Sequence, residues 1–137
     1  MTLGIKQKDA PLIYSYQFLT DTDFTGNEAE LVNLTSAGLV ELTSDLADNA
    51  IGVIEEVLWW DSDASEGNVM VRLFAPVVKV KCGGTAVACG ALLSPHTSDG
   101  VVLTATGAGT RVIGIALVGA DAGDVFDGTS GSRVDDV

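Results

Sequence analysis

The stretch Thr97–Leu117, which reads TSDGVVLTATGAGTRVIGIAL, decides the class of fold that we expect. It contains two short apolar runs, Val101–Leu103 and Val112–Leu117, in which β-branched residues dominate. Glycine-rich sequence separates the two runs. Because β-branched residues favour strands and glycines favour tight connections, the stretch predicts two strands joined by a turn rather than a helix.

The same pattern occurs 62 positions upstream, so the chain contains an internal repeat. Residues 29–54 align without a gap with residues 91–116, and eight of the 26 aligned residues are identical. Two copies are too few for a solenoid, so we predict one all-β domain built from two related halves. The aligned glycines Gly52 and Gly114 should mark equivalent points of tight backbone approach.

Composition limits both the architecture and the kinds of partner. The chain has 137 residues, enough for one domain with a core, and 16 glycines against 3 prolines, which is typical of a turn-rich globular protein. Its 19 acidic and 7 basic residues give a net charge of −12. A strongly negative surface opposes binding to a nucleic-acid backbone or to an anionic membrane, so we expect neither as a partner. The apolar runs are also too short to span a bilayer as helices.

The first 25 residues differ from the rest, and we interpret residues 1–25 as an N-terminal arm or edge strand. They hold the basic and aromatic candidates for a contact with a partner, which are Lys6, Lys8, Tyr14, Tyr16 and Phe18. Strict alternation starts only at Tyr14 and predicts a strand in the chain's own sheet over residues 14–18. Residues 1–13 are then expected to pack on a neighbouring chain.

Residues 26–126 are predicted to form the β-domain that contains both half-repeats. A last short strand is expected near Val125 and Phe126. Residues 127–137 are rich in acidic residues and glycine, so we interpret them as an acidic C-terminal tail.

The stretch from Trp59 to Asn68 resembles an insertion and carries two adjacent tryptophans and several acids. Adjacent strand residues face opposite ways, so one of Trp59 and Trp60 should enter the core and the other should be exposed. An exposed tryptophan is typical of an interface anchor or a sugar-stacking platform. The acidic loop 61–66 is similar to a calcium loop, but its fifth position is serine, its glycine comes one place late and no helix flanks it.

No catalytic motif is recognisable. There is no G-x-S-x-G elbow and no phosphate-binding loop, and the single histidine, His96, follows a proline in a turn. Cys82 and Cys89 could face each other across a hairpin, but two reduced thiols are the more common arrangement in a chain without a secretory signal. We therefore expect no enzymatic activity, no cofactor and no metal.

Taken in order, the motifs resemble the small head-decoration (cement) proteins of tailed bacteriophages. The residues that carry the resemblance lie within about 26–120: a V-x-L strand leading to I-G-V, the central VMVRLFAPVVKV, the step at Ala86–Leu92, and TSDGVV followed by RVIGIALVGADAGD. The family usually has an acid where this chain has Ala91. The motifs are glycines and β-branched residues, and no residue-level contact carries over from them.

The resemblance implies a compact β-barrel or β-tulip-like domain that forms a homotrimer. It implies binding to the major capsid protein on the outer surface of the virion, after synthesis in the host cytoplasm, and clamping of neighbouring capsid subunits. Under this hypothesis the candidate interface residues are Lys6, Lys8, Tyr14, Tyr16, Phe18, Trp59 and Trp60. The alternative is a carbohydrate- or receptor-binding β-module that uses Trp59, Trp60 and the acidic loop 61–66.

Overall fold

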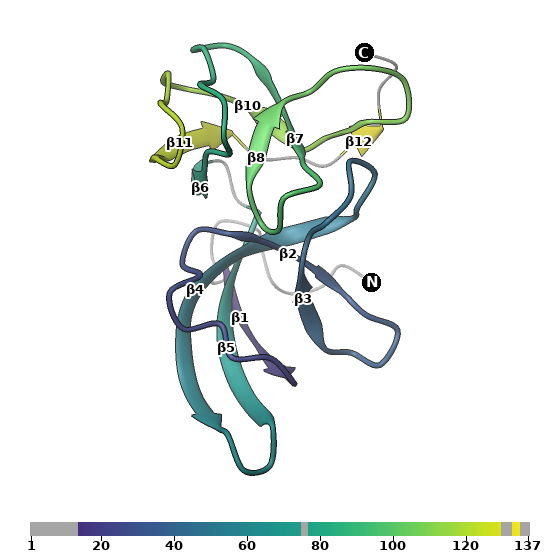
Figure 1. Ribbon diagram of the computed structural model, residues 1–137, viewed down its shortest axis with the longest axis vertical. Coiled ribbons are helices and arrows are strands. Elements are labelled where there is room, and N and C mark those ends of the chain that lie inside the picture. The colour runs from purple at the N-terminus through teal and green to yellow at the C-terminus, as the bar shows by residue number, and fades with distance from the viewer. Residues whose placement is uncertain (1–13, 75–76, 130–132, 135–137) are drawn as a thin grey trace, which may run out of the picture.

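The structure is a computed structural model that describes residues 14–74, 77–129 and 133–134 (Figure 1). The described residues contain strands and no helix, which confirms the all-β class. The strands are β1 (Ser15–Thr20), β2 (Leu31–Leu34), β3 (Val40–Leu42), β4 (Ala50–Asp61), β5 (Glu66–Leu73), β6 (Val77–Lys81), β7 (Leu92–Pro95), β8 (Val102–Thr104), β9 (Arg111–Val112), β10 (Gly114–Ile115), β11 (Val125–Thr129) and β12 (Arg133–Val134).

The N-terminal half is one antiparallel sheet of five strands in the order β1-β5-β4-β2-β3. The strands β4 and β5 form a long hairpin that projects away from the rest of the molecule, as the lower part of Figure 1 shows. The predicted strand over residues 14–18 is β1, which pairs with β5 and forms one edge of this sheet.

The C-terminal half repeats this strand order in smaller pieces. Strands β10, β7 and β8 form one sheet, and β11 and β6 form another. An isolated bridge between Ala116 and Gly128 places β11 beside the β10 segment, and the amide of Leu117 donates to the carbonyl of Asp127 (3.0 Å). The resulting order, β6-β11-β10-β7-β8, corresponds strand by strand to β1-β5-β4-β2-β3.

Strand register shows how the two halves correspond. In the first half Val32 pairs with Gly52, and in the second Leu93 pairs with Gly114. The glycines are 62 positions apart, but the residues of β2 and β7 that face them are 61 apart. The ungapped alignment is therefore displaced by one residue in this strand, because the connection between β7 and β8 is one residue longer than that between β2 and β3. Superposition of the halves in space stays a prediction.

Two apolar clusters form the core, and one of them joins the halves. The first lies within the N-terminal sheet and comprises Phe24, Val32, Val40, Ile54, Val69 and Val71. The second is built on Val80, Leu93, Val102 and Phe126 of the C-terminal half, and Leu31, Ala50 and Val53 of the N-terminal half pack into it. The C-terminal half therefore covers one face of the N-terminal sheet, next to the start of the long hairpin.

Gly52 lies where two strands approach too closely for any other residue. A Cβ atom at this position would lie 2.1 Å from the carbonyl oxygen of Arg72 on β5. The pairing of β2 with β4 shifts register next to Gly52, so the strand is irregular here. This confirms the predicted tight approach at Gly52.

Two features of the predicted architecture need comment. No closed barrel is found among the described strands, so the barrel or β-tulip description stays a prediction. The predicted start of the C-terminal tail at residue 127 is wrong for residues 127–129, which continue β11 and pair with β6. Residues 133–134 form β12, which pairs with β9. Asp127 and Gly128, which indicated a tail, lie in a strand with neighbours on both sides, where Asp127 is half-buried and Gly128 is buried.

Candidate interaction surfaces

The long hairpin holds one tryptophan in a fixed position on an uncovered sheet face. Trp59 on β4 is 44% exposed. The side-chain amide of its cross-strand neighbour Asn68 is assigned the orientation in which both its oxygen and its nitrogen find partners. The oxygen then accepts a hydrogen bond from the indole N–H (3.0 Å), and the nitrogen donates one to the carbonyl of Phe18 (3.1 Å). The bond fixes the indole against the sheet, so its outer side is a rigid apolar surface that loses little conformational entropy on binding.

The second tryptophan does not enter the core, contrary to the prediction for this pair. Trp60 is half-buried and lies over Gly67 on the opposite strand, where a Cβ atom would lie 2.9 Å from the indole ring. It belongs to neither apolar cluster. The reason is its place in the hairpin, because this part of β4 extends past the elements that cover the sheet.

The acidic loop 61–66 closes the hairpin. A carboxylate oxygen of Asp61 accepts hydrogen bonds from the backbone amides of Asp63 (3.0 Å) and Ala64 (3.3 Å), so this side chain stabilises the turn. Within the described part of the chain, no three or more His, Cys, Asp or Glu side chains are grouped so that they could hold a metal ion.

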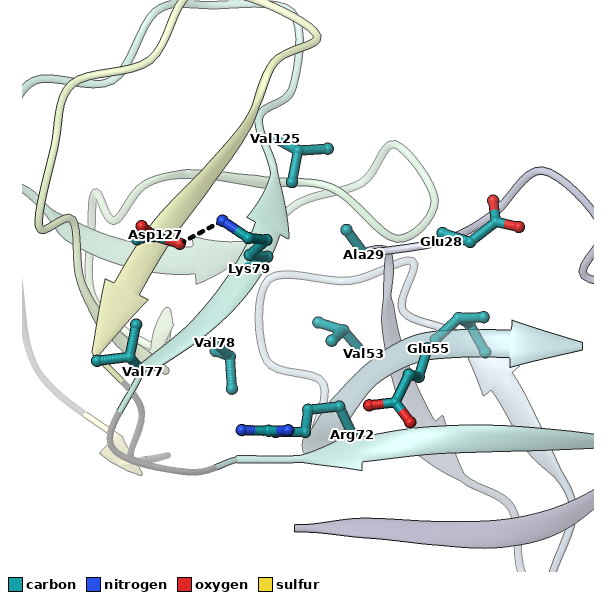
Figure 2. Close-up of a pocket in the computed structure, with 11 residues that line it drawn as sticks. Glu28, Ala29, Val53, Glu55, Arg72, Val77, Val78, Lys79, Val125 and Asp127 are labelled. Atoms are coloured by element: carbon teal, nitrogen blue, oxygen red, sulfur yellow. Dashed lines mark hydrogen bonds and ion pairs between the residues drawn. The ribbon is translucent and has the colours of Figure 1, made fainter.

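A groove of about 520 Å3 lies between the two halves (Figure 2). Strands β6 and β11 form one wall, and β4, β5 and the segment before β2 form the other. The described residues that line it are Glu28, Ala29, Val53, Ile54, Glu55, Arg72, Val77, Val78, Lys79, Val125 and Asp127. They include no histidine, cysteine or serine.

Four charged side chains of the groove each interact with a neighbouring side chain, through an ion pair, a cation–π contact or a hydrogen bond. Lys79 and Asp127 form an exposed ion pair (2.9 Å) on one wall, which Figure 2 shows as a dashed line. On the other wall the guanidinium of Arg72 lies over the ring of Tyr14, with 5.0 Å to its centroid. The Nε atom of Arg72 is buried and has no hydrogen-bond partner among the described residues. The hydroxyl of Ser15 donates to Glu55 (3.1 Å).

The wall formed by β6 has an open backbone edge. The amide of Cys82 donates to the carbonyl of Asp124 (2.8 Å), so the even-numbered residues of this segment bond towards β11. Backbone hydrogen-bonding directions alternate along a strand, so the backbone N–H and C=O groups of the odd-numbered residues point into the groove. One of them, Lys81, donates its amide to the carbonyl of Ala29 (3.1 Å) in the other half.

The predicted interface residues fall into separate places. Lys6 and Lys8 lie outside the described residues. Tyr14 stacks on Arg72 at the groove. Tyr16 and Phe18 form an aromatic pair on β1, with ring centroids 5.1 Å apart, and only Phe18 also packs against the core. Asn68 links the backbone carbonyl of Phe18 to the indole of Trp59, so Phe18 lies one strand away from that tryptophan.

Sequence reasoning missed several exposed apolar residues. They are Leu19, Leu34, Leu58, Val77, Ile115, Leu117, Val118 and Val125. Each lies in an ordinary apolar run, so the pattern alone indicated burial. Arg72 was also missed, because a single cation within the strand VMVRLF carries no signal that it lines a groove.

Both cysteines are free thiols. Cys82 is buried and its Sγ donates to the carbonyl of Thr85 (3.2 Å), whereas Cys89 is exposed beside the carbonyl of Leu117 (3.4 Å). His96 accepts a hydrogen bond from the amide of Ser98 (3.3 Å) in a turn. These three side chains therefore have local structural roles.

No family model and no curated protein matches this chain. The described residues contain no helix of the length and apolarity needed to cross a membrane.

Proposed function

We propose that the protein is a capsid-decoration (cement) protein, which binds the outer surface of a phage head and stabilises it by clamping neighbouring capsid subunits. The observation that carries the proposal is the indole of Trp59, fixed by Asn68 on an uncovered sheet face. A rigid, exposed tryptophan on a projecting hairpin is typical of an anchor for a protein partner. Because the sequence resembles cement proteins, the partner that we propose is the major capsid protein.

Stabilisation follows from mass action under this proposal. A protein that binds only the assembled shell lowers the free energy of that shell and not of its separated subunits. If the bound form is a homotrimer, three modest contacts act together, and the avidity exceeds that of each contact. Lys6 and Lys8 in the N-terminal segment are proposed to add contacts with the capsid, so removal of residues 1–13 should weaken binding to heads.

The test is binding to phage heads that lack a decoration protein. Purified protein is mixed with such heads, sedimented and quantified, and the heat resistance of the heads is measured with and without it. We expect Trp59→Ala to weaken binding about tenfold or more, as for a hot-spot residue. Leu34→Ala is the matched control, because Leu34 has a similar exposure (45%) but lies on β2, which pairs with the start of β4 and not with the part that carries Trp59.

Two results would reject the proposal. One is wild-type protein that does not sediment with undecorated heads, and the other is Trp59→Ala protein that binds as well as the wild type. Thermal melts of the free variants show that any loss of binding does not come from unfolding. Loss of the Trp59 indole should cost the free protein about 1–3 kcal/mol, because it removes one hydrogen bond and the packing of a side chain that is 44% exposed.

A second candidate function is a carbohydrate- or receptor-binding module at the same hairpin. It is favoured by the amide of Asn68, and by that of Gln17 beside it (3.3 Å), because sugars bind to a flat aromatic ring flanked by hydrogen-bonding groups. A glycan array probed with wild-type and Trp59→Ala protein, with and without calcium, separates the two functions. Glycan binding that depends on Trp59, without binding to heads, would favour this second candidate.

A further inference from the structure

The contact between the two halves of the chain supplies a template for a contact between two chains. In this contact the open edge of β6 lies against the segment before β2, and the amide of Lys81 donates to the carbonyl of Ala29 (3.1 Å). Val53 on β4 is covered by the C-terminal half and is only 4% exposed. The template thus has a donor side, β6, and an acceptor side around Ala29 and Val53.

The C-terminal half has its own copy of the acceptor side. The amide of Ala29 donates to the carbonyl of Ile54, and in the second half the amide of Gly90 donates to the carbonyl of Ala116, both at 2.8 Å. Ala29 and Gly90 both have positive φ, 68° and 85°. Gly90 is therefore the counterpart of Ala29.

Nothing in the described chain covers this second acceptor side. Leu31 pairs with Val53 and Leu92 pairs with Ile115, so Ile115 is the counterpart of Val53. Ile115 is 40% exposed, and the neighbouring Leu117 is exposed as well. An apolar strand position that is buried in one half is thus open to solvent in the other.

Among the described residues no strand pairs with the outer edge of β1, so the N-terminal half has a matching donor side. Register makes β1 the counterpart of β6, because Ser15 faces Arg72 on β5 as Val77 faces Thr129 on β11. The amide of Leu73 donates to the carbonyl of Tyr14, so the backbone groups of the even-numbered residues of β1 bond to β5. The backbone N–H and C=O groups of its odd-numbered residues therefore point away from β5, past the edge of the sheet. Leu19, the counterpart of Lys81, is one of these and is 58% exposed.

We infer that the outer edge of β1 in one copy docks on the Gly90–Ile115–Leu117 surface of a second copy, repeating between chains the contact made within each chain. The amide of Leu19 would donate to the carbonyl of Gly90. The side chain of Tyr16, which is 56% exposed and is the counterpart of the Val78 that packs in the same cluster as Val53, would cover Ile115. The contact is head-to-tail, so it uses two different surfaces and builds a ring when the rotation closes. It also pairs an edge strand that is otherwise open to non-specific association.

The inference goes beyond the proposed function, because the contact needs no capsid and leaves the face of Trp59 free. It specifies which surfaces would join the subunits of the proposed homotrimer. Failure of binding to heads therefore leaves the self-contact standing, and failure of the self-contact leaves the Trp59 surface available for a capsid.

A cysteine cross-link tests the geometry directly. In the template Lys81 lies at Ala29, so Leu19→Cys should place its thiol near the native Cys89 of the next copy, which is exposed and precedes Gly90. Mild oxidation should yield covalent dimers and larger species on a non-reducing gel. These species should be lost in the double variant that also carries Cys89→Ser. Leu34→Cys is the control, with an exposed thiol outside the proposed contact.

Charge substitutions test the head-to-tail character. Tyr16→Glu blocks the donor side and Ile115→Glu blocks the acceptor side, so each variant alone should be monomeric by light scattering. A mixture of the two retains one intact pairing, Ile115 of the first variant with Tyr16 of the second, and should form dimers. Thermal melts establish whether both variants fold. If either does not, the Leu19→Cys cross-link alone tests the contact.

The inference is overturned if Leu19→Cys cross-links no more than Leu34→Cys does. It is also overturned if folded Tyr16→Glu and Ile115→Glu proteins associate as the wild type does, or if wild-type protein is monomeric at every concentration tested. A symmetric dimer in which each surface contacts itself predicts no recovery on mixing, so that outcome also counts against the head-to-tail contact.

Discussion

Gly52→Ala is the substitution that most directly tests the packing of β4 against β5. The added Cβ would lie 2.1 Å from the carbonyl oxygen of Arg72 and 2.9 Å from both the carbonyl carbon of Arg72 and the Cα of Leu73. All three are backbone atoms, so no side chain can rotate away to make room. The two strands must separate locally by roughly 1 Å to restore van der Waals contact.

The cost of this separation can be worked from the contacts around it. Moving the strands apart weakens about two ladder hydrogen bonds, each worth about 1 kcal/mol. Val53 follows Gly52 and packs into the cluster that joins the halves, so displaced packing should add about 1–3 kcal/mol. We expect a loss of about 3–5 kcal/mol of unfolding free energy, a large share of the 5–15 kcal/mol of a typical domain.

Thermal and urea unfolding of the purified variant measure this loss. At about 3 °C per kcal/mol, Tm should fall by roughly 10 °C. Gly84→Ala is the matched control, because nothing lies within 4 Å of its added Cβ, and its unfolding free energy should change by no more than about 0.5 kcal/mol. A Gly52→Ala protein that melts within about 1 °C of the wild type would refute the close approach of β4 and β5.

Three further outcomes are expected. Ala29→Gly should raise the unfolding free energy by up to about 1 kcal/mol, because it relieves a left-handed non-glycine backbone at φ 68°. Gly90→Ala at φ 85° should lower it by about 1 kcal/mol for the opposite reason, and chemical denaturation of both variants measures the two changes. A thiol reagent should modify Cys89 in the native protein and Cys82 only after unfolding, and two reactive thiols in the native state would contradict the burial of Cys82. Burial raises the pKa of the Cys82 thiol, helped by the carboxylates of Asp124 and Asp121. The native state then holds this proton to higher pH than the unfolded chain does, so stability should decline as pH rises above the ordinary thiol pKa of about 8.5, and Cys82→Ala should reduce that decline in pH-dependent melts.

The sequence by itself determined the class of the fold and most of its strands. Alternation from Tyr14, the run VMVRLF and the β-branched runs on either side of Gly107 all correspond to strands or their immediate flanks, because side-chain periodicity and β-branching act locally. The repeat also fixed Gly52 as a point of close approach, since only glycine tolerates it. The glycine repeated at positions 52 and 114 is visible in the sequence, although the strand contact that requires it at position 52 is not.

Only the tertiary structure decided which apolar residues are left exposed. Val53 and Ile115 occupy matching strand positions, yet Val53 is buried and Ile115 is exposed. The C-terminal half covers the sheet face that carries Val53, and no described element covers the face that carries Ile115. The one-residue slip between β2 and β7 was also hidden, since a longer loop absorbs it without changing either strand. Trp60 stayed out of the core for a similar reason: the length of β4 carries it past the layer that would have buried it. Periodicity assigns a residue to a face of a strand, and only the packing of whole elements determines whether anything covers that face.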